Sequence, residues 1–353
     1  MRLGAKTLES PFVLAPMAGL TDTAFRRLVK RQGGCGLVVT EMVSSEGLVR
    51  GIDRTLDFAE YTEEERPVSI QIFGGDAAKM AEAAGLVEAM GADIVDVNMG
   101  CPVPKIAKHN AGCSLMRDPS QAACIVRAMT DAVRIPVTVK MRTGWDEEHI
   151  NAPLLAQMME DAGAAAVSVH GRTAKQSYSG YSDWELISNV AESVRIPVFG
   201  SGDCVTPEQM VARTRTAGVA GILVGRGALR NPWIFRQASA RIAGEQPTLV
   251  SLKERGDFLL EYIDLLMGEI TEERCGFRHH APGSNSRKLV SARAPRSRER
   301  WVVNKLRALG AWYTKGLRGG SKLRTSINQA ASLEALRDVI HIHFFQRSLD
   351  TAN

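Results

Sequence analysis

A repeating unit of short strand, glycine-rich turn and helix constrains the fold of the first 240 residues more than any other feature. Eight apolar segments of strand character recur there, at 12–16, 37–41, 68–72, 94–98, 136–141, 166–170, 196–200 and 221–225. Amphipathic patterns such as "DAAKMAEAAGLVEAMGAD" separate them. Strands that are apolar throughout and alternate with helices are typical of a parallel sheet covered by helices.

Residues that favour helix starts and stops divide this region at regular points. Three helix-capping residues precede a proline, namely Asp118, Thr206 and Asn231. Each pair predicts a helix that begins at the proline. Three glycines follow helical patterns and predict their ends, namely Gly91, Gly163 and Gly218.

Eight such units over about 230 residues match a (β/α)₈ TIM barrel, whose usual length is roughly 250 residues. A doubly wound open sheet is the alternative, but it usually has fewer units. Beyond the barrel, helical patterns occupy 250–270, 301–317 and 326–345, and the Arg-, Ser- and Pro-rich stretch 271–300 predicts a mobile loop. We therefore expect a TIM-barrel catalytic domain at 1–245 and a small all-helical domain at 246–353.

Positive charge is concentrated in the C-terminal part. Residues 274–324 contain fourteen Lys and Arg and a single acidic residue, Glu299, whereas the rest of the chain is net negative. This asymmetry favours a polyanionic partner, with a solvated basic surface as the alternative. Nothing in the sequence requires more than a monomer.

Cysteine spacing and hydropathy exclude several classes of protein. The six cysteines form no C-x-x-C pair, which argues against a zinc site and a disulfide framework. No apolar stretch has the roughly 20 residues that span a bilayer. The first residues also lack the apolar segment of a signal peptide, so we expect a cytoplasmic protein without metal.

The segments that follow the eight strands all carry polar or glycine residues. In this fold, the loops at the carboxyl ends of the strands build the active site. The last two, "GSGD" at 200–203 and "GRGA" at 225–228, follow strands 7 and 8, where phosphate sites usually lie. Glycines allow backbone N–H groups to approach an anion, and Arg226 adds a positive charge. A phosphorylated ligand is therefore favoured over simple tight turns.

Strand alternation places Lys140 and His170 inside the barrel mouth. A buried lysine is costly unless it faces an anion. The negatively charged pyrimidine edge of a reduced flavin is one such anion, and the amide of Gln71 is suited to the same ring. A hydrogen-bonded core residue is the simpler interpretation of His170 on its own.

Four motifs in order, "PMAGLTD", "DVNMGCP", "VKMRTGW" and "HGRT", resemble those of bacterial tRNA-dihydrouridine synthases, most closely the B-type subgroup. The resemblance covers residues 1–240 and returns at "WYTKGLRGG". It implies FMN as cofactor, NADPH as reductant and a specific uridine in tRNA as substrate.

The resemblance also implies site residues. The residues that would contact FMN are Pro16, Met17, Ala18, Gln71, Lys140, His170, Ser201, Gly202, Asp203, Gly225 and Arg226. The target uracil would contact Asn98, Arg142 and Tyr178, with Cys101 as proton donor. The family's usual asparagine is Ser201 here, which puts a side-chain contact at that position in doubt.

The thiol of Cys101 fits the reaction that the resemblance implies. Saturating the C5–C6 bond of uracil requires a hydride at C6 and a proton at C5. A thiol with a pKa of about 8.5 is mostly protonated at neutral pH and can donate that proton. Two alternatives remain: a flavin oxidoreductase of a free pyrimidine, of the dihydroorotate or dihydropyrimidine type, and a non-catalytic RNA-binding protein.

Overall fold

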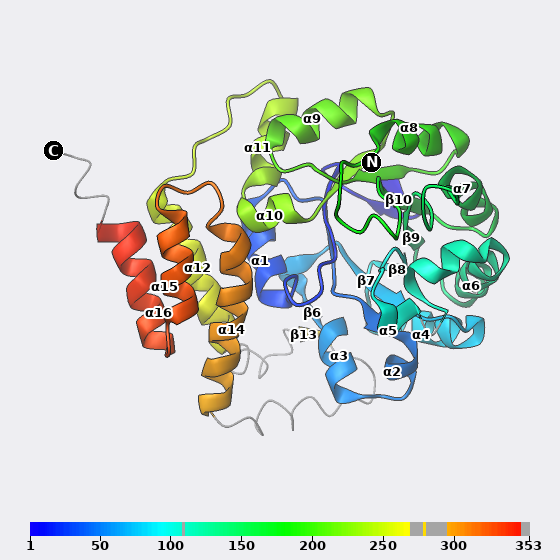
Figure 1. Cartoon of the computed structure of the whole chain (residues 1–353). Helices are drawn as coiled ribbons and strands as arrows, with labels where there is room; N and C mark the ends of the chain where they lie inside the picture. Colours follow the sequence, from blue (N-terminus) through cyan, green and yellow to red (C-terminus); the bar gives the residue numbers. More distant parts are fainter. Residues whose placement is uncertain (108–109, 269–277, 280–294, 347–353) are drawn as a thin grey trace.

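The computed structural model describes residues 1–107, 110–268, 278–279 and 295–346 (Figure 1). Its centre is a closed barrel of eight parallel strands, β3 (Phe12–Leu14), β4 (Leu37–Val39), β7 (Val68–Phe73), β8 (Ile94–Met99), β9 (Val137–Arg142), β10 (Ala166–His170), β11 (Val198–Ser201) and β12 (Gly221–Val224). The pairing of β4 with β7, in which Val38 lies opposite Val68, closes the barrel. A short strand, β5 (Val43–Ser44), also pairs with β7. The predicted TIM barrel is confirmed.

Helices surround the barrel between successive strands (Figure 1). They are α1 (Thr23–Gln32), α2 (Ser45–Val49), α3 (Asp53–Ala59), α4 (Ala77–Ala89), α5 (Pro104–Ala107), α6 (Pro119–Ala132), α7 (Ala152–Asp161), α8 (Trp184–Ser193), α9 (Pro207–Thr216), α10 (Arg226–Arg230) and α11 (Ile234–Ile242). The side chains of Asp118 and Thr206 cap α6 and α9 as predicted. All three predicted stop glycines have positive φ. The cap predicted at Asn231 is wrong, because α11 begins three residues later and the Asn231 amide instead donates to Gln237 Oε1 at 2.7 Å.

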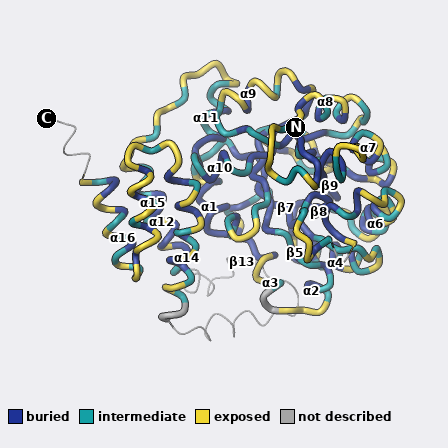
Figure 2. The backbone as a smooth tube through the Cα atoms, in the orientation of Figure 1, coloured by how far each residue is buried: buried dark blue, intermediate teal, exposed yellow. Residues whose placement is uncertain are grey.

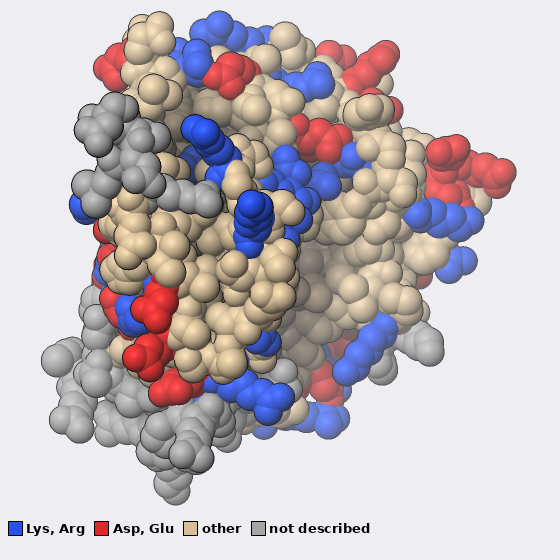
Figure 3. Space-filling view, turned by 60° about the vertical axis from the view of Figure 1, so that its left-hand side comes forward, with Lys and Arg blue, Asp and Glu red and all other residues tan. Residues whose placement is uncertain are grey.

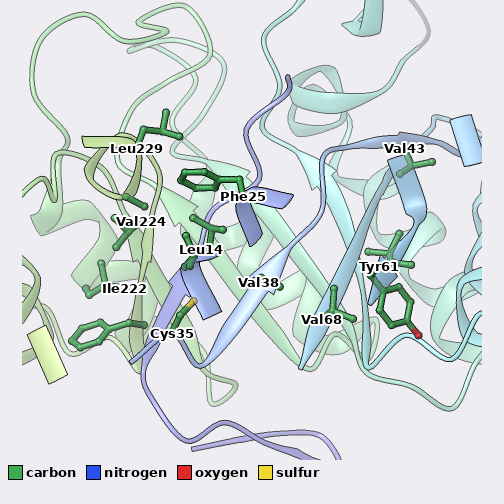
Figure 4. Close-up of a cluster of buried hydrophobic side chains, with 14 of the residues drawn as sticks. Leu14, Phe25, Cys35, Val38, Val43, Tyr61, Val68, Ile222, Val224 and Leu229 are labelled. Carbon is green, nitrogen blue, oxygen red and sulfur yellow. The ribbon is translucent and has the colours of Figure 1, made fainter. Parts of the chain in front are cut away.

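Strand alternation separates two apolar layers. Outward-facing strand residues such as Leu14 and Ile222 pack with helical side chains such as Phe25 and Leu229 (Figure 4). Inward-facing residues form a smaller cluster inside the barrel, to which the N-terminal hairpin β1 (Arg2–Leu3) and β2 (Lys6–Thr7) adds Leu3. The strands are accordingly the most continuously buried part of the chain (Figure 2). This cluster fills the amino-terminal end, so the polar inward residues lie toward the carboxyl ends.

A group of helices packs beside α1 and α10 after the barrel (Figure 1). They are α12 (Leu252–Gly268), α14 (Pro295–Tyr313), α15 (Gly320–Gln329) and α16 (Leu333–His341), followed by a π-helical turn at Ile342–Gln346. The single helix predicted at 326–345 is wrong. The chain leaves the helical conformation at Ala330, and the Ser332 side chain caps a new helix through the Ala335 N–H. The division at residue 245 stays a prediction.

Most of the predicted loop at 271–300 lies outside the described residues. Two parts of it are regular structure instead: β13 (Arg278–His279) pairs with β6 (Tyr61–Thr62), and α14 starts six residues earlier than predicted. Across the described ranges, no helix is long and apolar enough to cross a membrane.

Candidate active site at the mouth of the barrel

One pocket at the carboxyl ends of β9 to β12 and β3 gathers most of the residues that the sequence suggests. Its lining includes Pro16, Met17, Lys140, His170, Tyr178, Ser201, Gly202, Asp203, Gly225 and Arg226. These residues come from five strand ends that are far apart in the chain. Ala18 lies on the same loop as Met17, but it is exposed and does not line the pocket.

One side of the pocket is built from the loops after β11 and β12. Asp203 accepts from Arg172 Nη2 at 2.8 Å and from Arg226 Nη2 at 3.1 Å, and its Oδ2 accepts the Ser182 N–H at 2.7 Å. One carboxylate therefore faces two guanidinium groups, which leaves this end net positive. Within α10, the N–H groups of Ala228 and Leu229 bond the Gly225 carbonyl, whereas those of Arg226 and Gly227 lie at the helix start, where no intrahelical acceptor precedes them. These features suit an anion.

Glycine keeps this wall open at Gly225. A Cβ atom there would lie 3.3 Å from Met17 Sδ, on the opposite wall. A side chain at this position would therefore press against Met17 and displace the pocket lining between the loops after β3 and β12. The glycine-rich loops, the positive end and the inward lysine together suit an anionic ligand.

Lys140 and His170 both line the pocket from inside the barrel, as predicted. Burial, and secondarily the charge of Arg142, lowers the pKa of Lys140 to about 8. Burial also lowers the pKa of His170 well below its usual value, with further contributions from Lys140 and nearby arginines. His170 is thus neutral at neutral pH. Lys140 is largely protonated there and loses its charge as the pH rises through about 8. A bound anion would raise the pKa of that lysine again.

A chain of buried hydrogen bonds, each with a defined donor and acceptor, links Asp96 inside the barrel to the loop after β8. Gln71 Nε2 donates to Asp96 Oδ2 at 2.7 Å, and Gln71 Oε1 accepts from Asn98 Nδ2 at 2.7 Å. Asn98 Oδ1 then accepts the backbone N–H of Cys101 at 2.9 Å and that of Gly100 at 3.2 Å. The amides of Gln71 and Asn98 therefore hold the loop in place.

Asp96 is the inner end of this chain, and the sequence analysis missed it. Its carboxylate also accepts from Thr138 Oγ1 at 2.6 Å, and its pKa is raised by burial. The backbone N–H groups of Gly100 and Cys101 fix the orientation of the Asn98 amide, so its Nδ2 faces Gln71 Oε1 and Gln71 Nε2 faces Asp96. The signal was available: Asp96 is a charged residue at an inward position of the strand that also carries Asn98.

Cys101 sits half-buried at the end of that chain. Besides its N–H bond to Asn98, its carbonyl accepts the Cys113 N–H at 3.1 Å. Burial raises the pKa of the Cys101 thiol, although a backbone hydrogen bond at Val103 and the charges of Arg142 and Lys140 oppose the shift. The thiol is therefore protonated at neutral pH and lies within electrostatic reach of the lysine that lines the pocket.

Arg142 and Tyr178 lie in the same region but differ in exposure. Arg142 is buried, and it donates to the carbonyls of Gly100, Thr173 and Ser177 at 2.8 to 2.9 Å. It thereby ties the Cys101 loop to the loop after β10. Tyr178 is 61% exposed, so its ring is open to a ligand above the pocket.

Two cationic groups flank the Tyr178 ring, Arg226 at 5.2 Å and Arg142 at 5.9 Å from its centroid. Arg172, the other residue that the sequence analysis missed, anchors the Tyr178 loop. It donates to the carbonyls of Ser179 and Gly180 as well as to Asp203. Its position in the "HGRT" motif was the signal.

A second, wider groove lies outside the mouth, beyond the Cys101 loop. It is bordered by Pro102, Cys113 and Trp145, and Arg117 lies over the indole ring at 4.8 Å. No residue predicted for the site lines it. Among the described residues, no group of three or more His, Cys, Asp or Glu side chains is arranged to hold a metal ion.

Comparison with known proteins gives one consistent answer. The family model described as dihydrouridine synthase matches residues 13–348. A probable tRNA-dihydrouridine synthase of Rickettsia bellii is 36% identical over 342 residues, which cover 96% of each chain. Another probable tRNA-dihydrouridine synthase, from Rhodobacter capsulatus, is 42% identical over 268 residues, or 75% of this chain and 82% of that one.

A B-type relative also matches. The tRNA-dihydrouridine synthase B of Pseudomonas aeruginosa is 40% identical over 283 residues, or 79% of this chain and 85% of its own. The resemblance carried by the four motifs is thus confirmed over almost the whole length. On the family model and these relatives, the chain belongs to the dihydrouridine synthase family.

Proposed function

We propose that this protein is a tRNA-dihydrouridine synthase that uses FMN and NADPH to reduce a uridine of tRNA to 5,6-dihydrouridine. The observation that carries the proposal is a pocket with an anion-binding end and an inward lysine; in the same barrel mouth, buried side chains of β7 and β8 hold the loop of a protonated thiol. Each of these parts also occurs singly in proteins of unrelated function, but their combination in a chain of this family supports flavin chemistry on a pyrimidine. Because tRNA is the substrate, we expect the protein to act in the cytoplasm.

The pocket would hold FMN by its two ends. The backbone of Gly202, Asp203 and Gly225, with the Arg226 guanidinium, would bind the phosphate, and Ser201 would contribute mainly through its backbone. Lys140 would face the pyrimidine edge of the ring, with Gln71 and His170 beside it and Pro16, Met17 and Ala18 along the β3 loop. When bound, FMN supplies a hydride that it has received from NADPH.

Cys101 would act as the general acid. Its thiol holds a proton at Sγ at neutral pH because burial raises its pKa. Asn98 and Arg142 hold the backbone of the loop that carries it through the Cys101 N–H and the Gly100 carbonyl, which would keep the thiol in a defined position relative to a bound base. A positioned acid of this kind contributes roughly 100- to 10,000-fold to a rate.

The target uracil would enter above the pocket from an extruded nucleotide, as base-modifying enzymes require. Tyr178 is exposed and flanked by arginines, so its ring suits stacking on the base. Asn98 and Arg142 would contact the same base only through groups that their internal hydrogen bonds leave available. All three assignments follow from the family resemblance.

Basic residues link this pocket to the helices after the barrel. The pKa of Lys315 is lowered, first by burial and then by the nearby charges of Arg230, Arg324 and Arg226. Arg230 and Lys315 lie over the Trp312 ring at 6.0 and 4.1 Å from its centroid, so positive charge gathers where the helices meet α10, and a polyanion would be attracted there. Figure 3 shows Lys and Arg side chains bordering a hollow on this face. This supports residues 246–353 as a tRNA-binding domain.

Mass spectrometry of the product tests the proposal. Purified protein with FMN and NADPH is incubated with tRNA that lacks dihydrouridine, and a gain of about two daltons per site is expected from adding two hydrogens. Free uridine and orotate-type pyrimidines are assayed in parallel. Equal reduction of the free pyrimidine would favour the small-molecule oxidoreductase, and a protein that binds tRNA but takes up no flavin would favour a non-catalytic RNA-binding role.

A further inference from the structure

A largely buried lysine from the helices after the barrel contacts the loop that forms part of the pocket wall. Lys305, on α14, donates to the carbonyl of Gly19 at 2.9 Å and forms ion pairs with Asp22 at 2.9 Å and Glu41 at 3.7 Å. Its side chain is only 13% exposed. Gly19 belongs to the loop after β3, which supplies Pro16 and Met17 to the pocket.

The loop after β3 is a compact turn that is held from both sides. The Met17 carbonyl accepts the N–H groups of Leu20 and Thr21 at 3.0 and 3.1 Å, and the Met17 N–H donates to Thr21 Oγ1 at 2.9 Å. At its tip, Gly19 donates its N–H to Glu41 Oε2 at 2.6 Å and offers its carbonyl to Lys305. Lys305 therefore joins this turn directly to the later helices.

The acidic partners need this cation. Burial raises the pKa of Glu41, and the charge of Lys305 is the largest effect that opposes the rise. Asp22 uses Oδ1 to cap α1 and Oδ2 to accept from Tyr262 at 2.7 Å, in addition to its pair with Lys305. Removing the ammonium would take away the largest effect that holds down the pKa of the buried Glu41 carboxylate, and the Gly19 carbonyl would lose this donor.

We propose that Lys305 is a positioning residue, through which the helices after the barrel set the turn that carries Met17 and so complete the cofactor pocket. The mechanism is local: Lys305 holds Gly19, Gly19 fixes the turn, and the turn places Met17 opposite Gly225. The inference rests on the proposed function, because it assigns FMN to this pocket. It adds that residues usually expected to serve tRNA binding also shape the flavin site.

The test compares Lys305→Met with two controls in the full-length protein. Tyr262→Phe removes a different hydrogen bond to Asp22 from the same group of helices without touching the turn. Lys253→Met removes one positive charge from an exposed position of α12. The measurements are the FMN dissociation constant by flavin fluorescence, the affinity for tRNA, and amide hydrogen exchange of peptides covering residues 15–22 without flavin.

We expect Lys305→Met to weaken FMN binding by about tenfold, the usual effect of losing a charged hydrogen bond. Exchange in residues 15–22 should become faster, and tRNA affinity should stay within about twofold of the parent. Both controls should resemble the parent in all three measurements. Parental FMN affinity, or equal losses in FMN and tRNA affinity, would overturn the inference.

A double variant separates positioning from charge balance. Glu41→Gln keeps an oxygen for the Gly19 N–H and removes the buried charge that Lys305 neutralises. Combined with Lys305→Met, it should restore thermal stability but not FMN affinity; restored affinity would overturn the positioning role. If the parent itself binds no FMN, the proposed function fails, and exchange at residues 15–22 alone then decides the role of Lys305.

Discussion

Replacing Asn98 by alanine should loosen the loop that carries Cys101. The Asn98 side chain makes three hydrogen bonds to nitrogen and oxygen partners, because it accepts from the backbone of Gly100 and Cys101 and donates to Gln71. Its Nδ2 also donates weakly to Met42 Sδ at 3.8 Å. Asn98→Ala removes all three and leaves two N–H groups and one amide oxygen without these partners. The substitution adds no bulk, so its effect comes from the lost hydrogen bonds and the space that the side chain leaves.

The expected magnitude follows from that count. A net loss of about 1 kcal/mol for each bond lowers the free energy of unfolding by about 3 kcal/mol. Asn151→Ala provides the scale, because Asn151 Nδ2 donates a single bond, to the Met116 carbonyl at 2.7 Å, on the outside of the barrel. The free energy of unfolding of this control variant should fall by about 1 kcal/mol.

Urea denaturation followed by circular dichroism measures both variants. Alkylation of Cys101 by iodoacetamide, followed by peptide mass spectrometry, measures the loop separately. Asn98→Ala should change the alkylation rate severalfold, because reactivity depends on the exposure of the thiol, while Asn151→Ala should not. If Asn98→Ala unfolds with the free energy of the parent, or if Cys101 reacts at the parental rate, the loop is not held as described.

Three further predictions concern the pocket itself. Cys101→Ala should still oxidise NADPH in the presence of FMN but should form no dihydrouridine, as measured by mass spectrometry; tRNA reduction at the parental rate would refute the acid role. Lys140 has a pKa of about 8 in the flavin-free fold and an ordinary one near 10.5 when unfolded, so the unfolded chain binds more protons between these values. Stability should therefore rise by about 3 kcal/mol from pH 8 to 10.5, and urea titrations of Lys140→Met should lack this rise. Gly225→Val should weaken FMN binding by at least about tenfold in a fluorescence titration, because its side chain would enter the space facing Met17; unchanged affinity would move the cofactor elsewhere.

Periodicity predicted the barrel because each strand end is marked locally. The turns at Gly91 and Gly163 and the caps at Asp118 and Thr206 depend on backbone chemistry within a few residues. The error at Asn231 has the same origin, since a local capping signal cannot reveal that Gln237 binds its amide. Local signals thus predict the order of helices and strands reliably, whereas they predict the first residue of each element less accurately.

The sequence could predict which residues lie near the site, but not which of their atoms make contact. Strand alternation placed Lys140 and His170 in the mouth, and the pocket contains both. The role of Asp96 as the fixed acceptor behind Gln71 depends on which atoms meet across β7 and β8, which no single segment encodes. The contact of Lys305 with Gly19 joins residues 286 positions apart, so it could be found only in the folded chain.

A crystal structure with bound flavin would show the proposed site itself. We predict FMN in the pocket lined by Met17, Lys140 and Arg226, with its phosphate against the backbone of residues 201–203 and 225–227. We also predict that Cys101 Sγ faces the space above the ring, where a pyrimidine can enter. Flavin bound at another place, or a Cys101 sulfur turned into the barrel wall, would contradict the proposal.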